Sequence, residues 1–238
     1  MSMIITSIDM SGRELSNVQF SEKDMSGVNL NNSILVFANF SQVDLTFAYM
    51  RYANLSDASF NHSKMQHADM LRANLSGASF INSDMYGSSL LNADLTVTKF
   101  VDTCLADADM FGVNLREAEL IDTILKNASL CSSNLFRANF SSVDMQGTLL
   151  SLSSLRFATL NNVDFSEATL REVDLSYTNM TGVNFTGANL AGTSLENATL
   201  SNVNLSGVNL AGVNLTSARL YNVDLTGANL TGAIGLKL

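Results

Sequence analysis

Proline is absent from this chain of 238 residues. Because proline has no backbone N–H, it is excluded from positions that must donate a hydrogen bond to a neighbouring segment. Its absence over this length favours a structure in which nearly the whole backbone is hydrogen-bonded to neighbours on two sides.

Cysteine is scarce, since Cys104 and Cys131 are the only two. Two thiols cannot form a disulfide framework, so we expect a reducing compartment and a cytoplasmic protein. No apolar run approaches the roughly 18 residues that would cross a membrane. The opening segment "MSMIITSIDM" also lacks the basic region of a signal peptide.

Positive charge is in the minority, with 13 Lys and Arg against 22 Asp and Glu and a net charge of -9. A surface that binds nucleic acid directly is basic, so we do not expect direct nucleic-acid binding. An acidic surface can instead attract a basic partner.

What the sequence does contain is an uninterrupted five-residue repeat. From Met10 to Leu230 every fifth residue is Leu, Phe or Met, which gives 45 consecutive centres. Between residues 11 and 230 the residue two before each centre is Ala, Val, Ser or Thr, except at Arg13 and Lys23. All 22 carboxylates lie at the other three positions. Ionised groups avoid an apolar interior, so the centre and the small residue are predicted to face inward.

Glycine marks the corners of the predicted structure. Thirteen of the 14 glycines, and nine asparagines, lie two residues after a centre. Both residue types accept a positive φ, which the third residue of a type II turn requires. Each pentapeptide is therefore predicted to form one short side and one bend.

A second period gives the number of sides. Phenylalanine occupies centres 20 residues apart, with leucine at the one gap: Phe20, Phe40, Phe60, Phe80, Phe100, Leu120 and Phe140. Like side chains stack in interior ladders, so a period of 20 laid over a period of five predicts four sides per coil. The expected fold is all-β, a quadrilateral parallel β-helix of about eleven coils at roughly 4.8 Å each.

Several segments carry a family resemblance. "ANLSGASF" (73–80), "ADLTV" (93–97), "GANLAGTSL" (187–195) and "GANLTGA" (227–233) resemble the A-(D/N)-L-x-x signature of pentapeptide repeat proteins over essentially the whole chain. The resemblance implies a right-handed β-helix. It also implies two alternative functions. Some members are DNA mimics that bind DNA gyrase or topoisomerase IV and protect against quinolones or related toxins, and others are bacterial effectors delivered to host cells.

We expect one solenoid over 10–233, preceded by a lead-in or cap at 1–9 and followed by an apolar tail at 234–238. Arg13 and Lys23 indicate a loosened or capping first coil. Ile234, Leu236 and Leu238 either fold over the last coil as a lid or contact a second copy end to end, as a homodimer.

The outward positions of the middle coils depart from a plain Ser, Thr, Asn and Gly surface. The apolar candidates for protein interaction are Leu71, Leu91 and Phe111 on one side, continuing into Cys131, and Ile81, Val101 and Ile121 on the opposite side. The acidic candidates are Asp102, Asp107, Asp109, Glu117, Glu119 and Asp122. Exposed apolar area often marks an interaction surface. The alternatives are that the apolar residues only stabilise neighbouring strands and that the acids only keep the rod soluble.

Further exposed aromatic and apolar residues form two predicted patches, one of Phe37, Phe47, Tyr49 and Tyr52 and one of Phe136, Leu152, Phe157 and Tyr177. No residues have the spacing of a metal site, a nucleophilic thiol or a phosphate-binding loop, and His62 and His67 lie on separate corners. We therefore predict a non-catalytic rod without a cofactor or metal, which binds a protein partner through its middle coils.

Overall fold

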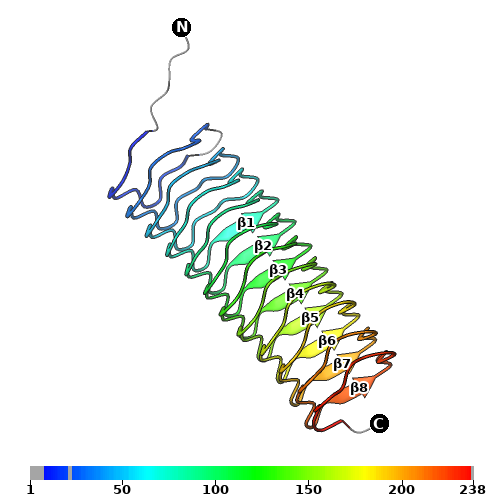
Figure 1. The fold of residues 1–238 in the computed structure, drawn as a ribbon. Coiled ribbons are helices and arrows are strands. Elements are labelled where there is room, and N and C mark those ends of the chain that lie inside the picture. Colours follow the sequence, from blue (N-terminus) through cyan, green and yellow to red (C-terminus); the bar gives the residue numbers. More distant parts are fainter. Residues whose placement is uncertain (1–7, 21–22, 237–238) are drawn as a thin grey trace.

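A computed structural model describes residues 8–20 and 23–236, which form an elongated parallel β-solenoid (Figure 1). The N-terminal coils, in blue, and the C-terminal coils, in red, lie at opposite ends of the rod. These two ranges contain no helix, and so none that could cross a membrane. The predicted all-β class is confirmed. Most of the predicted lead-in, residues 1–7, and the last two residues of the tail lie outside the described ranges.

One sheet of eight parallel strands runs along the rod in chain order. Its strands are β1 (Ser79–Ile81), β2 (Lys99–Val101), β3 (Glu119–Ile121), β4 (Asn139–Ser141), β5 (Thr159–Asn161), β6 (Asn179–Thr181), β7 (Thr199–Ser201) and β8 (Arg219–Tyr221). Each strand pairs with the residues 20 positions further along the chain, as Phe80 does with Phe100. The predicted 20-residue coil is therefore confirmed.

Isolated β-bridges with the same spacing complete the other three sides. In the first coil they start at Asp9, Glu14, Gln19 and Asp24, which gives four ladders and hence four sides. The eight strands of the regular sheet are separated by seven steps from one coil to the next. This sheet therefore covers fewer coils than the roughly eleven predicted for the chain. In the coils before β1, the same side of the solenoid is paired by isolated bridges, beginning with Gln19↔Asn39. The pairing in these coils does not extend over three residues.

We name the four sides A to D by their buried centres, which in one coil are Leu90 (A), Leu95 (B), Phe100 (C) and Leu105 (D). Each corner takes the letter of the side before it. Sides A and C face in opposite directions, as do sides B and D.

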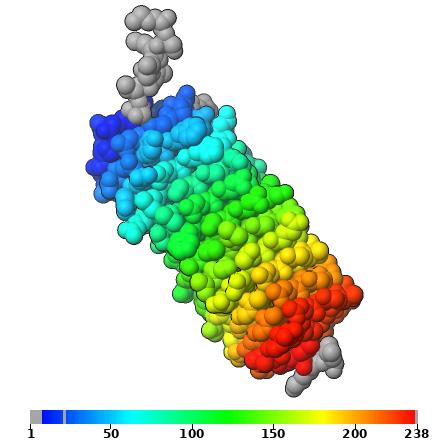
Figure 2. All heavy atoms as spheres, viewed as in Figure 1, coloured from blue at the N-terminus to red at the C-terminus, as the bar shows by residue number. Residues whose placement is uncertain are grey.

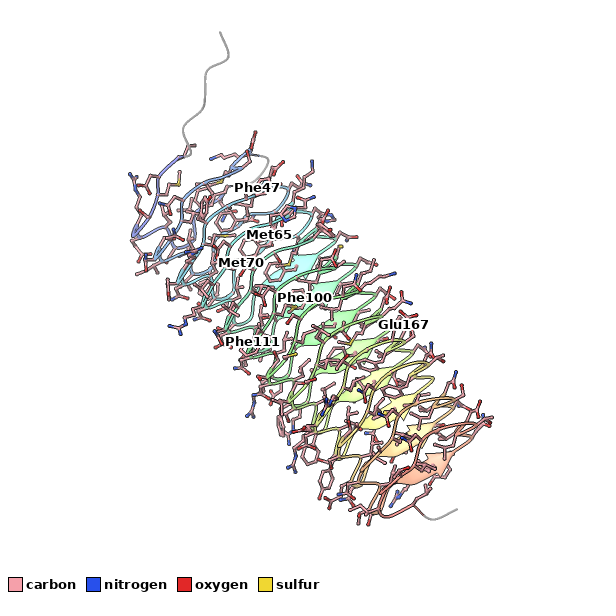
Figure 3. The ribbon with its side chains drawn as sticks, viewed as in Figure 1. Phe47, Met65, Met70, Phe100, Phe111 and Glu167 are labelled. Atoms are coloured by element: carbon pink, nitrogen blue, oxygen red, sulfur yellow. The ribbon has the colours of Figure 1, made fainter. Side chains whose placement is uncertain are left out.

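The phenylalanines of side C form a ladder inside the solenoid. The ring centroids of Phe40 and Phe60 are 5.0 Å apart with planes 2° from parallel, and those of Phe60 and Phe80 are 4.9 Å apart. All three rings are completely buried. Figure 3 shows Phe100 of the same ladder within the ribbon, together with Met65 and Met70. The predicted stacking on a single wall is confirmed.

The corners have the predicted backbone. Besides the glycines, many other residues two after a centre have a positive φ, from 48° at Asp122 to 63° at Leu152. The N–H of the next residue then closes the turn onto the centre, as from Val208 to the carbonyl of Leu205 at 3.3 Å. This is the arrangement of a type II turn.

In a typical five-residue repeat, four of the five backbone N–H groups donate to backbone carbonyls. Around the centre Leu205, the N–H groups of Asn204, Leu205 and Gly207 donate to carbonyls of neighbouring coils at 3.0, 2.8 and 2.9 Å, and Val208 closes the turn. The N–H of Ser206 instead donates to the side chain of Asn204 at 3.0 Å. Hydrogen bonding therefore accounts for the absence of proline at four positions of the repeat, and not at the residue after the centre.

This local bond explains the Asp or Asn of the repeat signature. The side chain one before the centre accepts the N–H one after it in coil after coil, as in Asp24 with Ser26 and Asp224 with Thr226, at 3.0 and 2.9 Å. The pKa of the Asp24 carboxyl is lowered below its ordinary value by this backbone bond and then by the Ser26 side chain, because both favour the ionised form. The pKa of the Asp224 carboxyl is lowered first by a hydrogen bond from the Thr226 side chain and then by the backbone bond.

The two ends of the solenoid are less well covered than its middle. Arg13 and Lys23, the two breaks in the inward pattern, are both exposed. At the other end Leu220 is only partly buried, and Leu236 packs against the core beside a cavity of about 70 Å³. Ile234 faces solvent. Whether the tail acts as a lid or as an end-to-end contact stays a prediction.

Candidate protein-interaction surface

The apolar residues predicted on side C form a continuous stripe. Ile81, Val101 and Ile121 end strands β1, β2 and β3 and lie in direct register, Ile81 beside Val101 and Val101 beside Ile121. Their neighbours inside the same strands are buried core residues, so these side chains point outward and are half-buried among themselves. We call these three residues the side C stripe.

Carboxylates border the side C stripe at corner C. Asp102 follows Val101 and Asp122 follows Ile121, at φ values of 49° and 48°. Both side chains are exposed, and among the described residues neither carboxylate is within ion-pair distance of a Lys or Arg. An apolar strip thus lies beside two uncompensated negative charges.

Beyond these carboxylates, corner C opens into a shallow groove of about 600 Å³. Asp102 and Asp122 form one wall, and the outward residues that begin side D, Asp84, Cys104 and Ile124, lie across from them. At its N-terminal end the groove meets a second hollow of about 340 Å³, which shares His62 and Lys64 with it. The groove belongs to the same surface as the side C stripe.

Sequence reasoning missed the contribution of Asp84, Cys104 and Ile124. They share one position of the repeat and recur 20 residues apart, which is the signal that a column exists. Finding the groove also requires knowing that this column adjoins the column of Asp102 and Asp122 across a corner.

The second predicted apolar stripe lies on the opposite side of the rod. Leu71, Leu91 and Phe111 are on side A in successive coils, held by hydrogen bonds such as that from the Asn92 N–H to the Phe111 carbonyl at 2.9 Å. Figure 3 shows Phe111 pointing out of the solenoid, and its side chain is 44% exposed. Cys131 continues this column. One flat partner surface cannot cover both stripes.

The six predicted acidic residues do not form one patch. Asp102 and Asp122 share corner C, whereas Asp107 lies on corner D, Asp109 on side A, Glu117 on corner B and Glu119 on side C. Two of them are also paired, Glu119 with Lys99 at 3.2 Å and Glu117 with Arg116 at 3.2 Å. The acids surround the coil, because successive charged residues in the chain are carried to successive sides.

The aromatic groups are likewise divided. Phe37 lies on corner B and Phe47 on the diagonally opposite corner D, so the predicted N-terminal patch is a belt around the rod. Phe157 and Tyr177 stack at 4.8 Å on corner B, whereas Leu152 lies apart from them on corner A.

On corner D, the pKa of Tyr86 is shifted by a neighbouring carboxylate. A hydrogen bond to the Asp107 carboxylate, and the negative charge of that group, raise the pKa of Tyr86 above its ordinary value of 10.0. In Asp107→Asn we expect this pKa to fall back toward 10.0, because the charge that opposes phenolate formation is removed. Titration of tyrosine absorbance measures the change.

The matched control for this titration is Asp109→Asn. The Asp109 carboxylate accepts the N–H of Phe111 at 3.2 Å and lies on a different side. It should leave the tyrosine titration unchanged. Superimposable curves for Asp107→Asn and the unsubstituted protein would contradict the assigned bond.

Metal-binding groups are dispersed over the surface. Within residues 8–20 and 23–236, His, Cys, Asp and Glu form no group of three or more that could hold a metal ion. Cys104 and Cys131 are both free thiols and half-buried.

A family model described as pentapeptide repeats matches nearly the whole chain, at residues 9–51, 24–61, 38–77, 53–90, 73–112, 114–151, 150–187, 178–216 and 193–232. No curated protein matches the chain.

Solved structures of several repeat proteins are similar to this one. HetL of Nostoc sp. strain PCC 7120, a protein involved in heterocyst differentiation regulation, is 26% identical over 98% of this chain and 92% of its own, with a TM-score of 0.43. Rfr23 of Cyanothece 51142 is 30% identical over 48% of this chain and 85% of its own, with a TM-score of 0.35. QnrB1, a plasmid-mediated fluoroquinolone resistance protein, is 14% identical over 94% of this chain and 92% of its own, with a TM-score of 0.36.

Proposed function

The chain belongs to the pentapeptide repeat family, and from that premise we propose that it is a non-catalytic rod that binds a protein partner along side C and corner C of its middle coils. The observation that carries this proposal is the side C stripe, bordered by the uncompensated carboxylates of Asp102 and Asp122. An apolar core with a charged rim is the usual anatomy of a protein interface.

Charge defines the kind of partner. Three carboxylates, those of Asp84, Asp102 and Asp122, line the groove against one cation, Lys64, and the whole chain carries a net charge of -9. Complementary charge speeds encounter and selects partners, so the partner should present Lys or Arg beside an apolar strip. Binding that depends on such pairs weakens as salt rises.

The rod form suits such docking. Figure 2 shows a straight, elongated body in which successive coils present their side chains in rows. The backbone is held by hydrogen bonds in every coil, so these rows are in place before a partner arrives. Little entropy is then lost on ordering this surface.

Substitution on the two opposite stripes tests the proposal. Val101→Asp with Ile121→Asp should weaken capture of the partner from lysate by about tenfold or more, because it places charge in the centre of the interface. The matched control, Leu91→Asp with Phe111→Asp, makes the same chemical change on side A. Both pairs point outward, so both variants should keep the cooperative unfolding of the rod.

Three outcomes separate the alternatives. Loss of the partner only with the side C variant supports docking there. Loss only with the side A variant transfers the site to Leu71, Leu91 and Phe111. Retention by both variants contradicts a role for either stripe.

A second candidate function is DNA mimicry toward a type II topoisomerase. Its support is the acidic charge of -9 together with the straight rod in Figure 2. A gyrase supercoiling assay with and without quinolone tests it directly. Unchanged gyrase activity at a large excess of this protein would exclude the idea.

A further inference from the structure

Corner B carries a cluster of opposite character to the rest of the rod. Three arginines and three aromatic residues gather there in four successive coils. We call this the arginine–aromatic corner, and its members are Arg116, Phe136, Arg137, Arg156, Phe157 and Tyr177. We propose that it is a second docking surface, which binds a carboxylate-bearing segment of a protein partner.

The rings and guanidinium groups form one continuous column, in which Phe157 stacks on Tyr177 and meets Phe136 edge to face. Phe157 lies 5.6 Å from Phe136 and 4.8 Å from Tyr177, measured between ring centroids. The guanidinium groups of Arg116 and Arg137 lie over Phe136, at 5.1 and 5.2 Å from its centroid. That of Arg156 is 5.7 Å from Phe157 and 5.5 Å from Tyr177.

The three arginines keep hydrogen-bond donors that the contacts within the cluster do not use. A guanidinium that packs its face on a ring keeps its in-plane N–H groups free for a carboxylate, which it binds with two parallel bonds. Each guanidinium has five N–H donors. Within the described residues, ion pairs join Arg116 and Arg137 to Glu117 at 3.2 and 3.9 Å, and Arg156 to Asp174 at 3.7 Å. The three arginine side chains remain 44–59% exposed.

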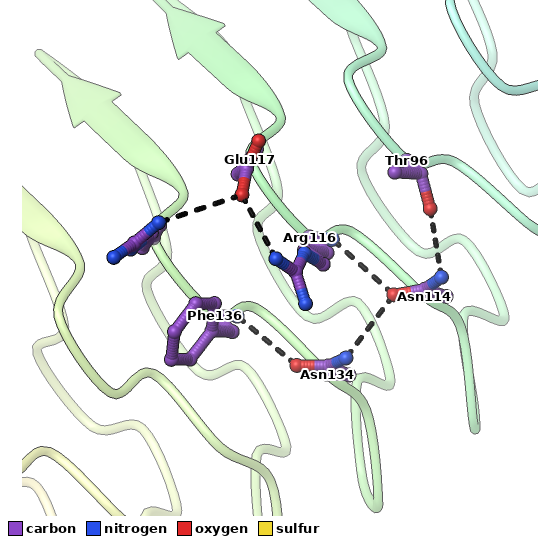
Figure 4. Close-up of polar contacts among 7 residues, drawn as sticks. Thr96, Asn114, Arg116, Glu117, Asn134 and Phe136 are labelled. Atoms are coloured by element: carbon purple, nitrogen blue, oxygen red, sulfur yellow. Dashed lines mark hydrogen bonds and ion pairs between the residues drawn. The ribbon is translucent and has the colours of Figure 1, made fainter.

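An amide ladder fixes the backbone beneath the cluster (Figure 4). Asn114 and Asn134 accept the N–H groups of Arg116 and Phe136 at 3.4 and 3.1 Å. Asn134 also donates to Asn114 at 3.2 Å, and Asn114 to Thr96 at 2.7 Å. The backbone that carries Arg116 and Phe136 is therefore in place before any ligand binds.

The fold itself does not require these residues. Arg137, Phe157 and Tyr177 stand at corner positions with φ values of 57°, 60° and 60°, which bulky side chains adopt at a cost in free energy. Glycine fills equivalent corners, as at Gly77 on the same column, and it forms the same turn.

Charge and spacing indicate the ligand. Glu117 and Asp174 pair with the arginines and the whole chain carries a net charge of -9, so the cluster is a small local positive patch rather than the extended basic surface that a nucleic acid requires. Arg116 to Arg156 spans two coil steps, roughly 10 Å, which about three residues of extended chain would cover. The ligand is therefore a short extended segment with two or three carboxylates, and the exposed rings of Phe157 and Tyr177 favour an aromatic residue among them.

A labelled random copolymer of glutamate and tyrosine is the probe, and fluorescence anisotropy measures its binding. Arg116→Gln, Arg137→Gln and Arg156→Gln together should weaken binding by about tenfold or more, since charge-assisted pairs are lost. The matched control removes three arginines elsewhere, with Arg51→Gln, Arg72→Gln and Arg171→Gln. It should change binding by no more than about twofold, because it alters only the overall field.

A lysine variant tests the geometry separately from the charge. Replacing the same three arginines of corner B by lysine keeps the charge but removes the planar pair of donors, so binding should also fall. Unfolding midpoints of all variants should stay near that of the unsubstituted protein. The proposal is overturned if the unsubstituted protein does not bind the copolymer, if the control weakens binding equally, if the lysine variant binds fully, or if oligothymidylate binds more tightly. Docking on side C does not depend on any of these results.

Discussion

Proline at position 207 is expected to destabilise the rod by more than about 3 kcal/mol, and proline at position 206 by less than about 1 kcal/mol. Gly207 has a φ of 66°, which proline cannot adopt. Its N–H also donates to the Thr226 carbonyl of the next coil at 2.9 Å, and proline removes that donor. Gly207→Pro therefore breaks both the turn and the ladder.

Ser206 differs in both respects. It is the second residue of its turn, where proline is favoured, and its N–H bonds only to the Asn204 side chain at 3.0 Å. Losing that part-buried bond is offset by the entropy that proline removes from the unfolded chain. Urea unfolding followed by circular dichroism compares the two variants. Equal destabilisation by both variants would contradict the expectation that position 206 tolerates proline.

Alanine at position 60 is expected to cost about 3–5 kcal/mol of unfolding free energy. The Phe60 ring is completely buried and stacked between Phe40 and Phe80, at 5.0 and 4.9 Å. Its removal leaves a cavity that the rigid coils on either side cannot close. Equilibrium unfolding in urea measures this loss.

Two companion variants make the measurement specific. Phe60→Leu should cost far less, about 1 kcal/mol, because leucine keeps most of the volume. Leu120 already stands in the same ladder, between Phe100 and Phe140, and is fully buried. Phe47→Ala should also be mild, because that ring is 58% exposed. A similar loss for Phe47→Ala and Phe60→Ala would contradict the assignment of the inner ladder.

The inside and the outside of the coil could be predicted from sequence because burial dominates the energetics. A charged side chain at a buried centre such as Leu90 would cost a large free energy of desolvation. The centres therefore carry no charged residue, and this regularity identifies the interior from the sequence. The 20-residue period was readable because Phe40 and Phe60 must lie on one wall to stack. Positive φ at corners followed from glycine and asparagine.

The candidate surface could be predicted only column by column. The stacking of Val101 on Ile121, and of Asp102 near Asp122, follows directly from the period. The meeting of Asp102 with Cys104 and Ile124 in one groove does not, because it depends on the width of the corner. Exposed pairs such as Lys99 with Glu119 contribute at most about 1 kcal/mol, too little to leave a mark on the repeat.

The Asp and Asn of the repeat were also missed as hydrogen-bond acceptors. Their position one before the centre, as in Asn74 before Leu75, indicates from the sequence only that these side chains face outward. Their role as acceptors follows from the backbone of the turn, in which the N–H of Ser76 needs a local partner.

The 20-residue winding has a consequence for how such a gene can change in length. Losing or gaining one codon moves the later centres and small inward residues out of the interior, so selection should remove such a change. Losing five codons between Asp102 and Asp122 spares the interior but turns all later columns by a quarter revolution, so that Asp122 would stack on Val97 of corner B rather than on Asp102 of corner C. Only whole windings can be duplicated without rearranging the surface, and evolution should therefore lengthen this protein in steps of 20 residues.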